Sequence, residues 1–435
     1  MLKHRRLIGL LVCAGALAAP GPALAGWVYT ISNNPLPGQN SVLALEYGSS
    51  GKLNPAHIRE YLTGGTGAPF LGGGKDAGTF GGDEELKLSL DKNLLYAVNQ
   101  GSNTITVFRV NKRTGALRRL SVTNSGGIAP ISIGVSKNRI VVANHGQISP
   151  FDIGGFLGGT VQPGPANFVS FSVSSSGKLT KLSTLPAGNT GATAAQLSPN
   201  GRNLFSTGFY GLNIFSATVS SSGTLAMAPG FPAHFPASIP AGITLPFFFP
   251  PVLVNLPFGV AVHPTKPYVY ILAAAAGRVA TYQYDTAGKL TFVGQVDNKN
   301  SVAACWTALS KDGRHLYTAN SASQNITHFN ISADGKTLTW AGVTSLIDKP
   351  DPGTVFNLAI SANGKFLFAV AGHDDPDGPR PQGVDFAKKT VKPAPADGNF
   401  VDAFRIGAGG GLTALSSTAL PVRHSQLPYG LQTIG

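Results

Sequence analysis

Three side chains in this sequence are the strongest candidates for a general base. His145 is the first choice, because an imidazole titrates close to neutral pH, and Glu84 and Glu85 are the alternatives. Such a base activates water for attack on a carbonyl carbon, provided that a donor or a cation stabilises the developing oxyanion. The competing hypothesis for His145 is a histidine on a surface rim with no function.

A second group of polar residues could bind a ligand. Asn99, Asn144 and Asn320 each come at the end of an apolar run, and their carboxamides could hold ligand oxygens, with His373 as a further ligand-binding residue. Asparagines in these positions are also typical turn residues, whose side chains pair with their own backbone. Both interpretations are open at this point.

Residues 373–378 form the densest ionisable cluster in the chain. His373 is followed by Asp374, Asp375 and Asp377, whose oxygens within a few residues of one another suit Ca²⁺ better than a soft metal. The twelve-residue spacing of a calcium-binding helix-loop-helix is missing. The alternative is a solvated acidic loop.

The composition indicates which elements must position these side chains. Among 435 residues there are 55 Gly and 31 Pro, and only 12% of the residues are charged. This abundance of turn residues argues against helical bundles, coiled coils and charged disordered tails. We therefore expect an all-β chain with many tight turns.

An internal repeat defines the architecture. A strand with alternating apolar residues, a Gly-x-Leu turn and another strand recur along the chain. The seven turns begin at Gly51, Gly115, Gly177, Gly223, Gly288, Gly335 (here Gly-x-x-Leu) and Gly410. A period of about 60 residues with four strands per unit is typical of a β-propeller. We predict seven four-stranded blades.

The ring should close between the two ends of the chain. The first blade lacks its innermost strand, and residues 428–434 resemble the innermost strand at 257–262. The C-terminal strand is therefore expected to complete the N-terminal blade, which leaves no free sheet edge. Ends of second strands and starts of innermost strands then share one face, so the predicted base and the asparagines should meet at one mouth of the central channel.

The first 25 residues are typical of an export signal. Lys3, Arg5 and Arg6 precede an apolar segment at 7–19, and 23–25 reads Ala-Leu-Ala. We expect a secreted or periplasmic protein in which residues 26–435 form a single propeller. Cys305 is then the lone cysteine, so no intramolecular disulfide can form.

The charge and hydropathy patterns restrict the kinds of binding partner that we expect. The formal net charge is +13, but Lys and Arg are scattered, so we expect no nucleic-acid partner. No run is long enough for a transmembrane helix. We expect a monomer that binds a small molecule or a surface partner.

Two long insertions interrupt the repeat, near 229–256 and 373–400. The first contains Phe231, Phe235 and the run 247–249 among many prolines. Exposed aromatics would form an apolar contact patch, as a lid over the channel or a docking site for a partner. The alternative is packing against the edge of a blade.

The blade motifs resemble one family of seven-bladed propellers. They are the second strands at 95–99, 142–145 and 316–320, the third strand at 105–108 and the Ser-Gly-Lys-Leu turns. With these motifs, almost the whole chain resembles the lactonase family, which includes 6-phosphogluconolactonase-like and carboxymuconate-cyclase-like proteins. The resemblance implies hydrolysis or isomerisation of a lactone or sugar-acid type of small molecule at the channel mouth.

The family comparison also shows a difference in the site. Where muconate-cyclase-like members carry an Arg-His pair and a Glu, this sequence has Phe258 and Gly259, and then Ala274. His145 is the position that could correspond to a family histidine. The alternative function is a non-catalytic propeller that binds a glycan, a peptide or a surface partner.

Overall fold

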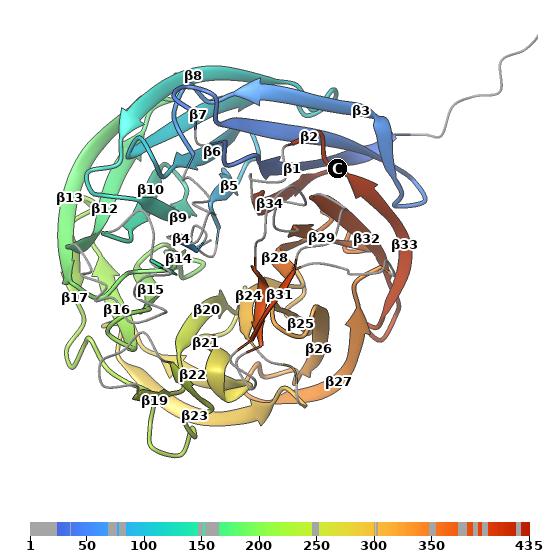
Figure 1. Cartoon of the computed structure of the whole chain (residues 1–435). Helices are drawn as coiled ribbons and strands as arrows, with labels where there is room; N and C mark the ends of the chain where they lie inside the picture. The colour runs from blue at the N-terminus through green and yellow to red at the C-terminus, as the bar shows by residue number, and fades with distance from the viewer. Residues whose placement is uncertain are drawn as a thin grey trace, which may run out of the picture.

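The protein is a ring of sheets around a central channel (Figure 1). The computed structural model describes residues 24–34, 36–67, 76–77, 84–146, 151–152, 165–245, 252–299, 301, 303–347, 354–372, 381–385, 390–393, 399–422 and 428–435. Seven antiparallel four-stranded sheets form the blades, which confirms the predicted all-β, seven-bladed propeller.

Each blade is described from its innermost to its outermost strand. Blades 1 to 4 consist of β34 (Tyr429–Ile434), β1 (Leu24–Ile31), β2 (Ser41–Gly48), β3 (Leu53–Leu62); β5 (Leu86–Leu88), β6 (Leu94–Asn99), β7 (Thr104–Val110), β8 (Leu117–Asn124); β9 (Pro130–Ser136), β10 (Arg139–Asn144), β12 (Ala166–Val173), β13 (Leu179–Gly188); and β14 (Gln196–Leu197), β15 (Asn203–Gly208), β16 (Asn213–Val219), β17 (Leu225–Met227). Blades 5 to 7 consist of β20 (Pro257–Val262), β21 (Tyr268–Ala273), β22 (Arg278–Tyr284), β23 (Leu290–Asp297); β24 (Ala304–Leu309), β25 (His315–Asn320), β26 (Asn325–Ile331), β27 (Leu338–Ser345); and β28 (Thr354–Ile360), β29 (Phe366–Gly372), β32 (Phe400–Ile406), β33 (Leu412–Ala419).

The C-terminal strand closes the ring, as predicted. β34 pairs antiparallel with β1, with Trp27 opposite Ile434 and Thr30 opposite Leu431. β34 also contacts β28 of blade 7 and β5 of blade 2. The tail therefore completes blade 1 and seals the ring on both sides.

The Gly-x-Leu turns join the blades to one another. All seven glycines have a positive φ, which a tight turn between the third and the outermost strand requires. At every one of them, a Cβ would press on a residue of the preceding blade; at Gly115 it would collide with the Trp27 ring. Tyr29 of the same preceding blade donates a hydrogen bond to the Gly115 carbonyl (3.0 Å). The repeated glycine is thus a contact between blades as well as a turn residue.

Much of the core lies between neighbouring sheets. Large side chains such as Trp27, Tyr47, Phe168, Phe215 and Phe368 are buried there. Their rings meet in tilted and edge-on pairs, for example Tyr47 with Phe368 at 5.0 Å between centroids. This packing holds neighbouring blades in a fixed orientation.

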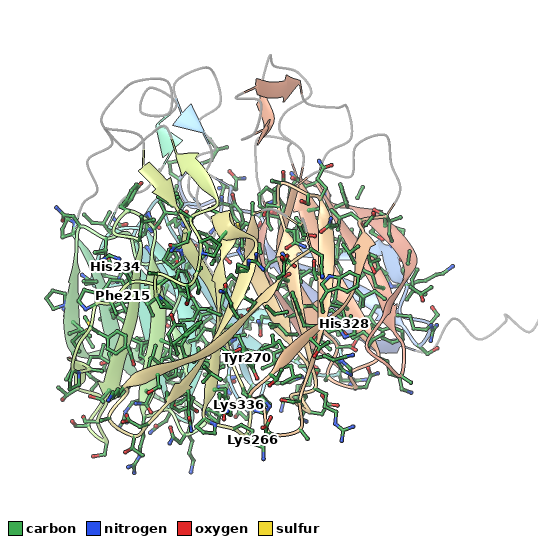
Figure 2. The ribbon with its side chains drawn as sticks, turned by 90° about the horizontal axis from the view of Figure 1, so that it is seen from below. Phe215, His234, Lys266, Tyr270, His328 and Lys336 are labelled. Atoms are coloured by element: carbon green, nitrogen blue, oxygen red, sulfur yellow. The ribbon has the colours of Figure 1, made fainter. Side chains whose placement is uncertain are left out.

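Three two-stranded sheets stand on one face of the ring, the insertion face (Figure 2). They are β4 (Asp76–Ala77) with β11 (Phe151–Asp152), β18 (Ile243–Leu245) with β19 (Val252–Val254), and β30 (Pro381–Asp385) with β31 (Thr390–Pro393). The opposite face, the turn face, carries the turns between innermost and second strands and the Gly-x-Leu turns; Lys266 and Lys336 mark it in Figure 2. A 3₁₀ helix, η1 (Ala274–Ala276), follows β21.

The first insertion packs partly against the blades. Phe235 and Ile239 are buried in a cluster with residues of β15, β16 and β20, and Phe231 packs against the same cluster. The packing alternative therefore holds for this part of the insertion. The phenylalanines at 247–249 and most of the second insertion lie outside the described residues.

The described residues contain no helix long and apolar enough to cross a membrane. The predicted signal segment lies almost entirely outside them, although β1 begins at Leu24, two residues before the expected mature start.

Candidate functional site

A cavity of about 430 Å³ occupies the channel on the side of the turn face. Its wall is formed by the innermost strands of the blades and by the turn after β5. Apolar groups of Val260, Leu309, Leu358 and Leu431 line it beside a small number of polar groups. A concave surface of this mixed kind suits a small organic ligand.

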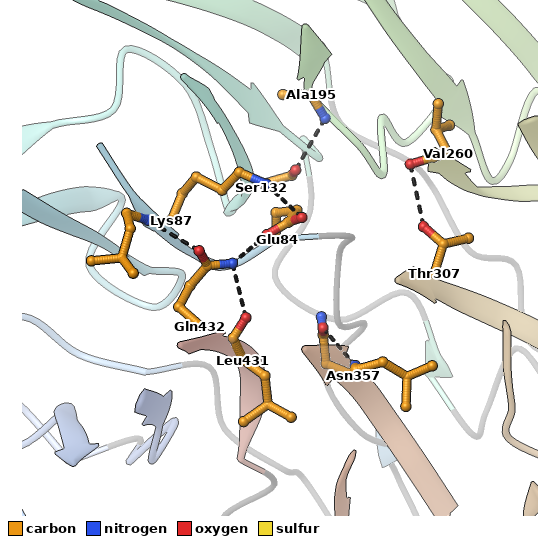
Figure 3. Close-up of polar contacts among 11 residues, drawn as sticks. Glu84, Lys87, Ser132, Ala195, Val260, Thr307, Asn357, Leu431 and Gln432 are labelled. Carbon is orange, nitrogen blue, oxygen red and sulfur yellow. Dashed lines mark hydrogen bonds and ion pairs between the residues drawn. The ribbon is translucent and has the colours of Figure 1, made fainter. Parts of the chain in front are cut away.

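An ion pair between Glu84 and Lys87 lies on this wall (Figure 3). The Lys87 Nζ lies 2.5 Å from the Glu84 Oε1. Gln432 of the closing strand donates its Nε2 hydrogen to the Glu84 Oε2 (2.8 Å) and to the Leu431 carbonyl (2.8 Å). Both oxygens of the carboxylate are therefore oriented by the protein.

The backbone holds Glu84 in a conformation that side chains rarely adopt. Its φ is +91°, in the region that favours glycine. The Glu84 carbonyl accepts a hydrogen bond from the Ile133 amide in blade 3 (3.0 Å), so contacts with two neighbouring blades fix the residue. Backbone strain that the surroundings maintain is characteristic of functional positions.

A second ammonium group lies at the rim of the cavity. Lys92 donates to the Thr433 carbonyl (3.4 Å) from the turn after β5. Its pKa is lowered, first by partial burial and then by the charges of Lys311 and Lys112. Lys311 and Lys112 therefore lie near enough to Lys92 for their charges to act on its ammonium.

Only one of the predicted bases, Glu84, lines the cavity. His145 is 1% exposed and lies between blades 3 and 4, with its Nδ1 3.0 Å from the Ala192 carbonyl and its ring 5.5 Å from that of Tyr210. Burial lowers the pKa of His145 to about 4, because the imidazolium would lose its hydration.

The two predicted carboxylates, Glu84 and Glu85, differ in their burial. His145 lies in another part of the ring from both of them. Glu85 is 2% exposed and packs against Gly430 of blade 1. Glu84 and Glu85 lie at the junction of blades 1 and 2, whereas His145 lies at the junction of blades 3 and 4. The structure therefore does not assemble the expected cluster at one mouth.

The three predicted asparagines hold loops of the insertion face. Asn99 and Asn320 have no exposed surface. The Asn320 Nδ2 donates to Asn325 Oδ1 (2.7 Å) and Thr327 Oγ1 (2.9 Å), and its Oδ1 accepts from Asn298 Nδ2 (2.8 Å).

The other two asparagines make similar contacts. Asn99 bonds to Thr104, Thr106 and Asn40 in the same way. The buried Asn144 donates to the Ser125 carbonyl (3.3 Å) and to Asn167 Oδ1 (2.9 Å).

The predicted calcium cluster cannot be placed. His373, Asp374, Asp375 and Asp377 lie outside the described residues. Within the part of the chain that the structure describes, no three His, Cys, Asp or Glu side chains converge on a common point as metal ligands would. The calcium hypothesis stays a prediction.

Sequence reasoning missed Lys87, Lys92 and Gln432. Lys87 could have been predicted, because it is a charged residue inside the short apolar strand β5 and follows Glu84 by three residues. Gln432 could not be found in this way. Its partner is 348 positions away in the sequence, and only ring closure brings the two together.

The fold and this cavity define the class of protein as a seven-bladed propeller with a cavity in its central channel. Two segments of the chain, 39–153 and 254–354, match the family model described as Lactonase, 7-bladed beta-propeller. Over these two segments the chain is similar to the lactonase family of seven-bladed β-propellers, which confirms the resemblance that its repeats indicate.

Relatives with curated names match only in part. A stretch of 106 residues, 24% of this chain and 29% of the relative, is 32% identical to the 6-phosphogluconolactonase of Yersinia pestis (strain Pestoides F). A stretch of 124 residues, 27% of this chain and 36% of the relative, is 32% identical to the 6-phosphogluconolactonase of Photorhabdus laumondii. The matched part thus spans less than two fifths of either relative.

Solved structures match almost the whole ring. The periplasmic gluconolactonase of Pseudomonas aeruginosa has a TM-score of 0.65 at 15% identity, covering 94% of this chain and 99% of that one. A protein from Lactobacillus plantarum has a TM-score of 0.59 at 16% identity, covering 94% and 100%. At these identities the likeness concerns the fold alone.

Proposed function

We propose that this protein is an exported lactone hydrolase that opens a sugar-acid type of lactone in the cavity near the turn face. The observation that carries the proposal is the Glu84–Lys87 pair (2.5 Å) on the wall of a cavity of about 430 Å³. The family match supports a lactone as substrate. The basic, apolar and Ala-Leu-Ala segments at the N-terminus support export, and the similar Pseudomonas protein is named as periplasmic.

In this mechanism Glu84 is the general base. The carboxylate removes a proton from a water molecule, and the water oxygen forms a bond to the lactone carbonyl carbon. Gln432 keeps the carboxylate in place while its charge falls. The bond from the carbonyl carbon to the ring oxygen then breaks, and the proton held by Glu84 passes to that oxygen, which gives the free hydroxy acid.

Lys87 supplies the positive charge for the oxyanion. When Glu84 takes up the proton, its attraction for the Lys87 ammonium weakens, and the ammonium can turn to the negative oxygen of the tetrahedral intermediate. Fixed charges in a cavity with apolar walls stabilise such an oxyanion more than bulk water does. Thr307, whose hydroxyl donates to the Val260 carbonyl (3.4 Å), offers an oxygen on the far wall for a ring hydroxyl.

This geometry favours Glu84 over His145 and Glu85 as the base. Both of the latter are almost fully buried, and neither lines the cavity. The pKa of His145, near 4, leaves its imidazole neutral at working pH, but the ring is enclosed by Tyr210 and Ala192.

Glu84→Gln tests the proposal with little change of shape. We expect kcat for D-glucono-1,5-lactone to fall by about 10²- to 10⁴-fold, the usual contribution of a general base. Proton release in a pH-stat, corrected for spontaneous hydrolysis, measures the rate. Glu60→Gln, at an exposed position of β3, is the matched control and should keep full activity.

Lys87→Met tests the role of the Lys87 ammonium separately from that of the base. Loss of oxyanion stabilisation is expected to lower kcat by about 10²- to 10³-fold, with Lys289→Met, at an exposed turn, as control. Full turnover by Glu84→Gln contradicts the assignment of the base. No turnover above the spontaneous rate by the wild type, over a panel of δ- and γ-lactones, favours the non-catalytic binding function instead.

A further inference from the structure

Five aromatic rings form a chain of contacts around the central channel. Four of them come from the innermost strands of blades 5, 6, 7 and 1, and the fifth directly follows the second strand of blade 4. We call them the aromatic girdle; its members are Phe258, Trp306, Phe356, Tyr429 and Phe209. None of these residues takes part in the proposed mechanism, so the girdle calls for an account of its own.

Each ring of the girdle packs edge-on against the next. The distances between ring centroids are 6.4 Å for Phe209 and Phe258, 5.9 Å for Phe258 and Trp306, 5.8 Å for Trp306 and Phe356, and 4.9 Å for Phe356 and Tyr429. The interplanar angles lie between 74° and 87°. Edge-to-face contacts of this kind are a preferred geometry for aromatic pairs. The chain of rings therefore crosses four junctions between blades in succession.

The girdle lies closer to the insertion face than the cavity does. The innermost strands run from the insertion face to the turn face. In β20, β24, β28 and β34, every residue that lines the cavity comes after the girdle residue of the same strand. In β24, for example, Trp306 precedes the lining residues Thr307, Ala308 and Leu309. The cavity therefore ends, on its insertion-face side, at the level of the girdle.

The five rings are almost inaccessible to solvent. The exposed fraction is 1% for Phe209 and Phe258, 4% for Tyr429, 5% for Trp306 and 8% for Phe356. A channel that was open at this level would expose the rings that surround it. The opening between the ribbons of the innermost strands in Figure 1 is therefore filled by side chains at the level of the girdle.

The other two blades add buried side chains beside the girdle. Glu85 of blade 2 is 2% exposed and lies next to Gly430 of the closing strand. At the opposite end of the chain of rings, Phe209 packs against Tyr210 with 5.3 Å between centroids, and Tyr210 packs against His145 of blade 3 at 5.5 Å. The two predicted bases that do not line the cavity thus extend the closed layer across blades 2 and 3.

A repeated irregularity of the backbone accompanies the girdle. In β20, β24, β28 and β34, the pairing with the second strand shifts register at or next to the girdle residue. Beyond this shift the pairing is regular through the residues that line the cavity. A β-bulge bends a strand and turns a side chain in a new direction. Four blades therefore use the same backbone device at the level where their rings meet.

We propose that the central channel is a blind pocket, which the aromatic girdle closes and which small molecules enter only through the mouth on the turn face. Its bearing on lactones rests on the proposed function: substrate and product then pass the same mouth, beside Leu90, which is 65% exposed and lines the cavity. The insertions on the opposite face do not gate such a site. The competing arrangement is a channel that is open at both ends.

The route of entry can be tested with a thiol on the cavity wall. Cys305→Ser removes the native thiol, and Thr307→Cys places a new one in the cavity. Mass spectrometry measures the rate at which iodoacetamide alkylates this thiol in the folded protein. Leu90→Trp narrows the turn-face mouth. Ile128→Trp adds a similar bulk to the loop after β8 on the insertion face, where Ile128 is 40% exposed.

We expect Leu90→Trp to lower the alkylation rate of Thr307→Cys by about tenfold, because it obstructs the only path to the thiol. Ile128→Trp should leave this rate unchanged. Thr224→Cys, at an exposed turn of blade 4, is the reference thiol in the same Cys305→Ser background, and neither tryptophan should change its rate.

Three results overturn the proposal. A rate that falls with Ile128→Trp, or that neither tryptophan changes, means that iodoacetamide enters through the insertion face. No alkylation of Thr307→Cys with Leu90 and Ile128 intact means that the turn-face mouth is closed. Alkylation needs no turnover, so a protein without lactonase activity refutes the proposed function and still decides this one. Where lactone is hydrolysed, Leu90→Trp should lower kcat/KM and Ile128→Trp should not.

Discussion

Gly115→Ala tests whether the repeated glycine really joins neighbouring blades. The glycine has φ +64°, and an alanine there costs about 1–2 kcal/mol in backbone strain alone. The new Cβ would also collide with Trp27, which is 2% exposed and has Arg59 on its ring at 4.9 Å. Overpacking of this kind adds about 1–3 kcal/mol. We expect the free energy of unfolding to fall by about 2–5 kcal/mol.

Gly364→Ala is the matched control for this substitution. Gly364 has a similar φ of +71°, but nothing lies within 4 Å of the added Cβ, so only the backbone cost of about 1–2 kcal/mol applies. Urea denaturation followed by tryptophan fluorescence measures both variants. If Gly115→Ala destabilises no more than Gly364→Ala, the contact between blades 1 and 2 contributes nothing, and the interpretation of the repeat is refuted.

Two further substitutions examine residues that the sequence singled out. His145→Gln should make the free energy of unfolding less dependent on pH. Burial lowers the pKa of the His145 imidazole to about 4, so in the wild type its contribution to stability is complete above about pH 6.5 and is lost as the pH falls towards 4. Denaturation midpoints at several pH values measure the difference. Asn320→Ala should lower the free energy of unfolding by about 1–3 kcal/mol, because it removes one of the buried hydrogen-bond partners of Asn298 and one of those of Thr327. Its KM for a lactone should stay unchanged; a raised KM with full stability would instead support the ligand-binding hypothesis.

The ring was predictable because its determinants are local and repeated. A glycine in a tight turn followed by a buried leucine, as at Gly115 and Leu117, forms a sequence motif of only three residues. Seven such motifs predict seven blades. Even the closing strand could be found, because Tyr-Gly-Leu at the start of β34 resembles Phe-Gly-Val in the innermost strand β20.

The site was much harder to predict, because its contacts cross the ring. His145 and Glu84 are both polar residues next to buried strands, and nothing in the sequence states that one is enclosed between blades while the other lines a cavity. The height of a residue along the channel depends on the stagger of neighbouring innermost strands. β5 has only three residues, so Glu84 lies level with Ile133 in the middle of β9.

Closure of the ring and assembly of the proposed site depend on the same strand. Gln432 orients Glu84 of blade 2, and its neighbour Thr433 donates to the Ile360 carbonyl of blade 7 (2.7 Å) and accepts from Lys92 (3.4 Å). A tail that detaches therefore removes an orienting donor and one side of the cavity together. Because a strand at a chain end opens more readily than strands inside a blade, activity is expected to disappear before the seven blades unfold.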